Sequence, residues 1–541
     1  MSNGDAVNGN GPAVDATHTP SQRYLSTRGE DSGLSFEDVV LKGLATDGGL
    51  YIPEEIPQAS EWQSWKDLSF TDLAFNILSL YISPAEIPAD DLRDIIRRSY
   101  STFRSEHVTP LIHLKDNIHL LELFHGPTFA FKDVALQFLG NLFEYFLVRR
   151  NAGKEGRDRY HLTVVGATSG DTGSAAIYGL RGKQDVSVFM LHPKGRVSPI
   201  QELQMTTVLD ANVHNLAVTG NFDNCQDIVK ALFADPDINA THKLGAVNSI
   251  NWARILAQTV YYFYSYFQLA RQRPDAFKMG DKVRFSVPSG NFGDILAGYF
   301  AFRMGLPVDK FVIATNENDI LDRFWKTGRY EKKAADAQAA AEADGVKETL
   351  SPAMDILVSS NFERLLWFLA YEFAAAAGMD DEWNKRQAGQ EVAAWLSDLK
   401  TKGGFGPVYP DVLASARRTF ESERVSDPET LDAIRAFYRG TGYVLDPHTA
   451  VGVEAARRSA ERAPQGVPII SLSTAHPAKF AGAVTLALDK EDGFDFENKV
   501  LPEQFVGLDK KEKRVREVAN DWKAVRDIVR EEVEAELQGK R

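Results

Sequence analysis

Apolar and polar residues recur with two different spacings along this chain, and the change between them predicts a layered α/β protein. Near the start, residues 70–82 (FTDLAFNILSLYI) and 89–103 (ADDLRDIIRRSYSTF) place apolar side chains three or four positions apart, as amphipathic helices do. From about residue 110, short runs rich in β-branched residues alternate with helical stretches. We therefore expect a mainly helical N-terminal region followed by α/β domains.

Strands and helices are predicted to alternate over most of the remaining chain. Strands are expected at residues 161–167, 185–191, 212–218, 282–290, 310–316 and 467–474. Helices are expected at residues 173–182, 198–209, 222–235 and 294–305. Consecutive strand–helix–strand units are right-handed and their strands are parallel, so ligands are expected at the carboxyl ends of the strands.

The overall composition argues against several classes of function. The chain has 541 residues and a net charge of -14, which disfavours nucleic acid or an anionic membrane as the main partner. Cys225 is the only cysteine, so an intrachain disulfide and a cysteine-based metal site are excluded, and no metal site is predicted. The sequence has no run of about 18 apolar residues, so no membrane span is predicted. Residues 1–20 lack the apolar segment of a secretory signal, so we expect a disordered tail and a cytoplasmic location.

The segment HGPTFAFKDVALQFLG, residues 125–140, contains the first candidate for chemistry. Lys132 lies among apolar residues that include Phe129, Phe131, Val134 and Leu136. An unpaired ammonium is costly to bury. Either the stem is covered while the charged end reaches water, or the lysine is buried for a chemical reason.

One strand-to-helix turn has the composition of a phosphate site. The strand that begins at Lys282 runs into glycines and then into a helix, where backbone N–H groups converge on an anion. The lysine of a Walker loop is missing, so backbone amides and hydroxyls would hold the phosphate. The alternative is an ordinary turn in which Asp294 caps the helix. The residues concerned are Ser289, Gly290, Asn291, Phe292, Gly293 and Asp294.

A second turn of this kind contains more hydroxyl groups than one helix cap needs. Its four hydroxyls and two glycines fit a second anion, either a phosphate or a carboxylate, although a capped loop gives the same pattern. The residues concerned are Thr168, Ser169, Gly170, Asp171, Thr172, Gly173 and Ser174.

Three further positions carry weaker signals. Asn248 and Arg254 lie near the start of an apolar helix and predict a phosphate clamp, with a surface ion pair as the alternative. Thr474 ends a predicted strand, so its hydroxyl is expected to face a ligand crevice unless this is an ordinary strand end. Asp446 and Pro447 fit the N-cap and first position of a helix, and we interpret them as structural.

A small phosphorylated cofactor joined to the lysine explains both the buried lysine and the anion-ready turns. Pyridoxal phosphate fits, because its aldehyde forms a Schiff base with a lysine while its phosphate is anchored separately. Four segments, in this order, then resemble the threonine synthases of the fold-type-II pyridoxal-phosphate family: YLSTRG with GLATDGGLYIP, HGPTFAFKD, GATSGDTGSAA and PSGNFGDILAGY. The resemblance covers Tyr24 to about Gly507 and favours the fungal-type branch.

The resemblance implies a role for each candidate residue. Lys132 is implied to be the Schiff-base lysine and a carrier of protons. Thr474 is implied to meet the pyridine nitrogen of the cofactor. Asp171 occupies the position where related enzymes place an asparagine near the ring hydroxyl. The loop Ser289, Gly290, Asn291, Phe292 and Gly293, with Asp294 adjoining, is implied to surround the cofactor phosphate. Substrate contacts are implied for Thr168, Ser169, Gly170, Thr172, Asn248 and Arg254.

The implied fold is that of tryptophan synthase β: two parallel-sheet α/β domains behind a mainly helical N-terminal region. The expected division is a tail at 1–20, an N-terminal region at 21–110, a large cofactor-binding domain at 111–152 and 266–510, and a small substrate-loop domain at 153–265. A charged C-terminal helix is expected at 511–541. An Ala-rich, charged insertion is expected near 329–352.

The implied reaction converts O-phospho-L-homoserine and water to L-threonine and phosphate. An alternative on the same fold is a pyridoxal-phosphate-dependent phospho-lyase that releases a 2-keto acid. An alternative of another class is a non-catalytic protein that binds a phosphorylated metabolite. The expected partner is the small-molecule substrate, and the sequence leaves the oligomeric state open.

Overall fold

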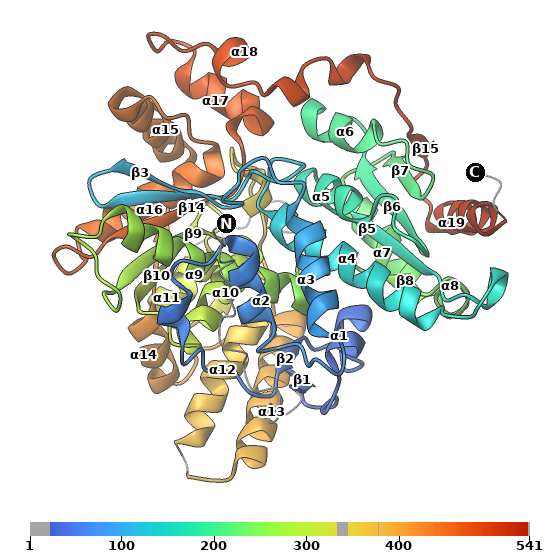
Figure 1. The fold of residues 1–541 in the computed structure, drawn as a ribbon, viewed down its shortest axis with the longest axis horizontal. Helices are drawn as coiled ribbons and strands as arrows, with labels where there is room; N and C mark the ends of the chain where they lie inside the picture. The colour runs from blue at the N-terminus through green and yellow to red at the C-terminus, as the bar shows by residue number, and fades with distance from the viewer. Residues whose placement is uncertain (1–21, 333–344, 377, 539–541) are drawn as a thin grey trace, which may run out of the picture.

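The structure is a computed structural model that describes residues 22–332, 345–376 and 378–538. The predicted tail at 1–20 lies outside the described residues, as do residues 333–344 of the predicted insertion. Figure 1 shows two sheets with flanking helices, one on each side of the view, and the N-terminal helices lie between them.

The larger sheet has six strands in the order β13–β10–β9–β14–β4–β3. Neighbouring strands are parallel except β3 and β4, which form an antiparallel pair at one edge. The central strands β9 and β14 are buried along their whole length, as expected for a sheet with helices on both faces. The bounds are β3 Leu111–Lys115, β4 Ile118–Glu122, β9 Val283–Pro288, β10 Val308–Thr315, β13 Phe420–Arg424 and β14 Ile469–Ser473.

The smaller sheet has five strands in the order β15–β7–β6–β5–β8, and all its neighbours are parallel. Three of these strands and the helices between them were predicted from the apolar pattern, and that prediction is confirmed. The bounds are β5 Leu162–Ala167, β6 Val186–Pro193, β7 Val213–Val218, β8 Leu244–Gly245 and β15 Arg516–Val518.

Helices connect the strands and cover both sheets. Their bounds are α1 Phe36–Lys42, α2 Phe70–Leu78, α3 Ala89–Tyr100, α4 Lys132–Arg150, α5 Asp171–Leu180, α6 Pro199–Thr206, α7 Phe222–Ala234, α8 Pro236–His242, α9 Trp252–Gln272, α10 Gly293–Arg303, α11 Ile320–Thr327, α12 Phe362–Ala375, α13 Asp381–Thr401, α14 Pro410–Thr419, α15 Asp427–Thr441, α16 Pro447–Ala460, α17 Ala481–Leu488, α18 Phe496–Lys499 and α19 Trp522–Leu537. None of the described helices has the length and apolar character that crossing a bilayer requires.

The N-terminal region is helical, as predicted, but it also contains a two-stranded antiparallel sheet that the sequence pattern did not indicate. Strands β1 (Tyr24–Ser26) and β2 (Tyr51–Pro53) form this sheet. Arg364 on α12, which is fully buried, fastens it to the large domain by donating to the carbonyl of Tyr51 at 2.9 Å and that of Ile250 at 2.7 Å. The N-terminal region is therefore tied to a loop beside the predicted substrate site.

The C-terminal segment differs from the expected solvated helix. Strand β15 adds to the edge of the smaller sheet beside β7, and α19 then buries Val525, Ile528 and Val529 against that domain. Apart from the buried Glu532, the charged residues of α19 are exposed or half-buried, so the charge pattern alone concealed the apolar stripe. Residues 516–537 therefore pack with the smaller sheet.

Candidate active site

The loop that carries Lys132 is held by an internal cap. Asp133 is buried, and its carboxylate accepts hydrogen bonds from the Thr128 N–H and the Thr128 hydroxyl, both at 2.7 Å. The N–H of Phe131 donates to the carbonyl of Thr474 at 2.8 Å. These bonds place the lysine, the first residue of α4, beside the carboxyl end of β14.

The Lys132 amine lies in surroundings that disfavour its charge. Its side chain is only 11% exposed. Burial lowers the pKa of Lys132, and the charges of Lys479 and Arg254 add to this effect while Asp171 and Asp133 oppose it. The N-terminus of α4 also presents the positive end of a helix dipole to the ammonium. Burial of the lysine is therefore confirmed, and the arrangement favours a neutral, reactive amine.

Asp171 stands between two buried lysines, one of which the sequence analysis missed. Its Oδ2 lies 3.7 Å from Lys132 Nζ, and its Oδ1 lies 2.8 Å from Nζ of Lys479, a side chain with no exposed surface. Gln201 also donates to Oδ1, at 2.7 Å. Burial disfavours ionisation of Asp171, but Lys479 and Lys132 hold its pKa below the usual range. The carboxylate is thus ionised and held mainly through Oδ1.

The predicted phosphate loop is open to an anion. The N–H of Ser289 donates to the carbonyl of Ala314, but no described residue accepts from the N–H groups of Gly290, Asn291, Phe292 or Gly293. Phe292 adopts the left-handed conformation, with φ of 63°, at the start of α10. A Cβ on Gly290 would lie 2.9 Å from the carbonyl oxygen of Ala353, so the close approach requires glycine. Such a cradle of free N–H groups at a helix start suits a phosphate.

The side chain of Asp294 neither caps α10 nor faces the phosphate loop. Phe292, and not Asp294, is the N-cap of α10. The Asp294 carboxylate turns away from the loop to the hydroxyls of Tyr261 and Tyr262, which donate to Oδ1, the second at 3.1 Å. Burial raises the pKa of Asp294 to about 7, even though the two hydrogen bonds act in the opposite direction. The N-cap reading is wrong, and only the backbone of Asp294 adjoins the phosphate loop.

In the turn at residues 168–174, some hydroxyl groups hold the backbone in shape and others remain free to bind a ligand. The Thr168 hydroxyl accepts from the N–H groups of Gly170 at 3.0 Å and Gly173 at 2.9 Å, so it shapes the turn from within. No described residue bonds the hydroxyls of Ser169, which is exposed, or Thr172, which is half-buried. The two free hydroxyls are therefore the members of this set that a ligand can use.

Arg254 is a buried cation without a described carboxylate partner. Arg254 lies in the first turn of α9, and its Nη1 donates to the carbonyl of Val247 at 3.0 Å. Its buried Nε has no partner among the described residues. Burial lowers the pKa of Arg254 to about 10. The surface ion-pair alternative is wrong, because the side chain is buried and unpaired by carboxylates. Asn248, by contrast, is exposed.

A second missed residue, Asn361, joins the two predicted phosphate sites. Its side-chain amide donates at 3.1 Å to the carbonyl of Ser249 and, also at 3.1 Å, to the carbonyl of Asn291. Asn361 lies just before α12, about a hundred residues from Asn248 in the chain. Its local sequence, SSNFER, gave no signal, because only the fold brings Asn361 to these loops.

The carboxyl end of β14 presents one hydroxyl that remains available. Ser473 bonds the Thr449 hydroxyl at 3.0 Å, whereas no described residue bonds the hydroxyl of Thr474. Asp446 caps α16 by accepting from the N–H groups of His448 and Thr449, with Pro447 at the first helical position, so that prediction is confirmed.

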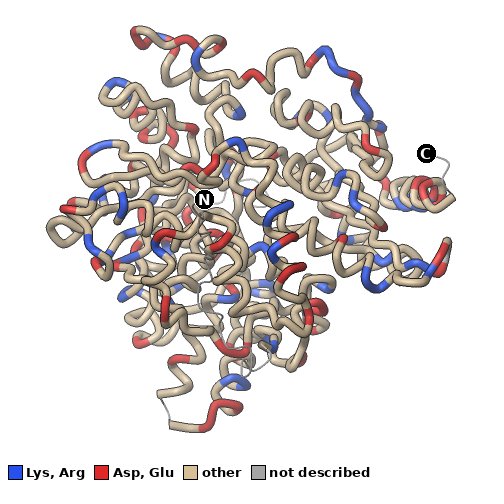
Figure 2. The backbone as a smooth tube through the Cα atoms, in the orientation of Figure 1, with Lys and Arg blue, Asp and Glu red and all other residues tan. Residues whose placement is uncertain are grey.

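These groups fit pyridoxal phosphate. The site combines a desolvated lysine, a cradle of free N–H groups, a free hydroxyl at a strand end and an excess of buried positive charge. Acidic and basic residues alternate along much of the chain in Figure 2, and the net charge of the whole chain is -14. The positive character is thus local to the site.

Comparison with known proteins gives the same family over nearly the whole chain. Residues 23–100 match a family described as Threonine synthase N terminus, residues 103–363 match Pyridoxal-phosphate dependent enzyme, and residues 449–529 match Threonine synthase, C-terminal.

Three relatives illustrate the extent of the similarity. A threonine synthase of Schizosaccharomyces pombe is 59% identical, over 90% of this chain and 93% of that protein. The crystal structure of threonine synthase from yeast superimposes with a TM-score of 0.87 at 55% identity, and covers 96% of this chain and 99% of that one. The pyridoxal-phosphate-bound threonine synthase from Brucella melitensis gives a TM-score of 0.82 at 42% identity, over 95% and 99% of the two chains. The chain therefore belongs to the threonine synthase family of fold-type-II, pyridoxal-phosphate-dependent enzymes.

Proposed function

We propose that this enzyme converts O-phospho-L-homoserine and water to L-threonine and phosphate. The overall change breaks the bond between the γ-carbon and the ester oxygen and adds the oxygen of water at the β-carbon. The site must therefore bind an amino acid and a phosphate together and move protons on adjacent carbons.

In this proposal the cofactor would be held by residues that follow four strands, β4, β9, β14 and β5. Lys132 joins its aldehyde carbon, the N–H groups from Gly290 to Gly293 hold its phosphate with Ser289 at the rim, and the Thr474 hydroxyl meets its ring nitrogen. Asp171 is assigned to the vicinity of the ring hydroxyl, as the resemblance implied. When bound, pyridoxal phosphate supplies an electron sink that stabilises negative charge on the substrate carbons.

Lys132 is the proton carrier. Because burial and neighbouring cations lower its pKa, the free amine of Lys132 would be available as a base beside the bound substrate. The helix dipole and Arg254 favour return of the proton from the ammonium, so the same nitrogen can deliver it to a second carbon.

The substrate phosphate is assigned to Arg254 and Asn248. The single observation that carries this assignment is that Arg254 is a buried guanidinium with no carboxylate partner among the described residues, close enough for its charge to act on Lys132. An unpaired buried cation is costly unless an anion completes it. Ser169 and Thr172 are assigned to the substrate carboxylate with the backbone of Gly170, while Thr168 holds their turn in shape.

The test is to incubate the purified protein and pyridoxal phosphate with O-phospho-L-homoserine and to quantify threonine and free phosphate together. Equal amounts of both products support the proposal. Phosphate with a keto acid and no threonine would move the function to the phospho-lyase. If neither product forms although the protein shows the spectrum of bound cofactor, the fold assignment would stand but the proposed substrate would be wrong.

We infer a division into two α/β domains around the two sheets, with the boundaries near residues 152, 265 and 510 that the sequence suggested. The parallel sheets support it, although β15 and α19 attach residues 516–537 to the small domain. A cytoplasmic location is also proposed. It is supported by a single cysteine, Cys225, which is buried and unpaired, as in proteins of reducing compartments.

A further inference from the structure

Lys479 is a second lysine at the active site that the proposed mechanism leaves without a task. It lies in a short 3-10 helix, Pro477–Phe480, directly after Thr474 and the end of β14. Its side chain has no exposed surface. A fully buried lysine is rare in proteins and is retained only where other groups compensate its charge.

The partners of Lys479 connect three separate elements. Its ammonium donates to the carbonyl of Thr128, in the lysine loop, at 2.7 Å, and forms an ion pair with Asp171 Oδ1, on α5 of the small domain, at 2.8 Å. Gln204 on α6 donates to the same Thr128 carbonyl at 3.1 Å. Lys479 therefore links the large domain to the small domain next to Lys132.

We propose that Lys479 is a positioning residue that holds Asp171 through Oδ1, so that only Oδ2 faces Lys132 and the Lys132 nitrogen is left with an incomplete counterion. The distances support unequal sharing of the carboxylate, since Asp171 lies 2.8 Å from Lys479 and 3.7 Å from Lys132. Gln201 occupies the same oxygen as Lys479 and prevents the carboxylate from rotating toward Lys132.

The charged groups around the Lys132 nitrogen come from four elements. Asp171 on α5 and Asp133 on α4 are acidic, and Lys479 on the 3-10 helix and Arg254 on α9 are basic. Asp133 is already satisfied by Thr128. His448 on α16 also faces Asp171, but it is engaged elsewhere: its Nδ1 lies 2.9 Å from Asp446 Oδ1, and its Nε2 accepts from the Ala353 N–H at 3.1 Å. Lys479 is thus the cation that decides how much of Asp171 is left for Lys132.

This inference rests on the proposed role of Lys132, but its test does not need turnover. The measurement is the pH midpoint of the absorption change that accompanies protonation of the nitrogen joined to the cofactor, in the holoenzyme without substrate. Removing a positive charge and releasing Asp171 both favour the protonated nitrogen, so K479M should shift the midpoint upward by about one to two pH units. D171N should shift it downward, because the counterion itself is lost.

The control is Lys183, a mostly buried lysine that pairs with Glu144 at 3.2 Å and Asn141 at 2.7 Å on the far side of α4. K183M should leave the midpoint unchanged. K479R, which keeps the charge, should return it toward the wild-type value. If K479M fails to fold, K479Q takes its place, because its amide still donates to the Thr128 carbonyl.

An unchanged midpoint in K479M or K479Q, or a shift in K183M as large as in K479M, would overturn the proposal. So would an unchanged midpoint in D171N. Failure of the proposed reaction is seen separately, because a wild-type enzyme that forms no threonine still displays the cofactor spectrum from which the midpoint is read.

Discussion

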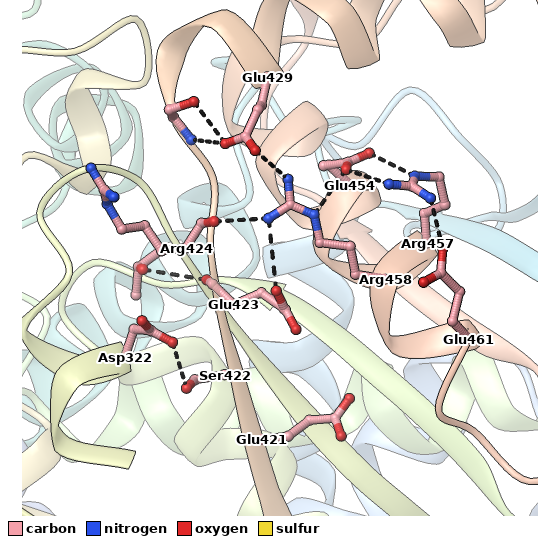
Figure 3. Close-up of polar contacts among 12 residues, drawn as sticks. Asp322, Glu421, Ser422, Glu423, Arg424, Glu429, Glu454, Arg457, Arg458 and Glu461 are labelled. Carbon is pink, nitrogen blue, oxygen red and sulfur yellow. Dashed lines mark hydrogen bonds and ion pairs between the residues drawn. The ribbon is translucent and has the colours of Figure 1, made fainter. Parts of the chain in front are cut away.

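Positive charges are paired differently in two regions of the molecule: the outer face of β13 and α16, and the interior around Lys132. On the outer face, Arg458 faces Glu429 at 2.7 Å and Glu454 at 2.9 Å, and Arg457 pairs with Glu454 at 2.8 Å and Glu461 at 2.9 Å (Figure 3). Arg457 thus has two carboxylate partners, and Arg458 has three, because Glu423 also lies 3.7 Å away. In the interior, by contrast, the cations outnumber the carboxylates that are free to meet them.

The interior holds Lys132, Lys479 and Arg254, and Asp171 is the shared carboxylate, since Asp133 is occupied by its own loop. Partly exposed charges are stabilised cheaply by pairing with one another and with water, and their net contribution is small. Buried charges without partners are costly, so they persist where a ligand completes them. We infer from this difference that the buried positive charge around Lys132 serves to bind an anionic ligand. The outer charges are already paired with one another and need no ligand.

The largest effect is expected when the Lys132 amine is removed from the interior. K132A should lower turnover by about ten-thousandfold, because the site loses both its point of cofactor attachment and its base. The fold should persist, since the loop is held by the bonds of Asp133 to Thr128 and not by the lysine. Threonine formation under steady-state conditions is the measurement, with K183M as the matched lysine variant expected to retain activity. Wild-type turnover in K132A would contradict the mechanism.

The next change removes the unpaired guanidinium. R254M should lower kcat/KM for O-phospho-L-homoserine by about a hundredfold or more, as loss of a buried charge contact to an anion does. R254K should lose less, because it keeps the charge but not the planar donors.

Arg284 provides the matched control for Arg254. It is equally buried but is paired with Asp309 at 2.6 Å and Glu421 at 3.3 Å. R284M should therefore lower the thermal unfolding temperature and leave KM unchanged. If R284M raised KM as much as R254M does, the distinction between the paired and unpaired arginine would fail.

The sequence was informative where the chemistry is local and silent where it depends on distant contacts. The lysine loop and the turns at 168–174 and 289–294 are each continuous, so composition alone led to a predicted role for each. Lys479 meets Asp171 across 308 positions, and that pairing depends on the fold. One local sign was available: Pro477, Ala478 and Phe480 surround Lys479 with apolar residues, as Phe129 and Phe131 do for Lys132.

The sequence misjudged Asp294 for a related reason. Its position after a glycine at a strand-to-helix turn is typical of an N-cap. The left-handed Phe292 shifts the helix start, and the tyrosines at 261 and 262 on α9 then offer the carboxylate buried donors. Neither the backbone angle nor the packing of α9 on α10 can be read from local composition.

Asp294 extends the comparison to a buried carboxyl group, because it has two tyrosine hydroxyls as donors but no cation beside it. Its pKa is raised to about 7 from an ordinary 3.8, so the folded state keeps a proton that the unfolded chain loses. The resulting stability is fully present below about pH 4 and is lost as the pH rises to about 7. Between about pH 5 and pH 8, wild-type protein should therefore lose roughly 2–3 kcal/mol more of its free energy of unfolding than D294N. Denaturant unfolding at both pH values measures the difference, and parallel losses in the two proteins would contradict it.

The smallest effect is expected in the outer network, where R457M removes an arginine whose side chain is 50% exposed. Water replaces the lost bonds, and Glu454 keeps Arg458 as a partner at 2.9 Å, so the free energy of unfolding should fall by less than about 1 kcal/mol. KM and the cofactor spectrum should not change, because the network is complete without a ligand. Raising the salt concentration should shrink even this small loss, since screening weakens an exposed pair in the wild type as well. Urea unfolding at low and high salt measures both effects. A cost as large as that of R284M would mean that the outer charges are as interdependent as the buried ones, and the contrast between the two regions would then disappear.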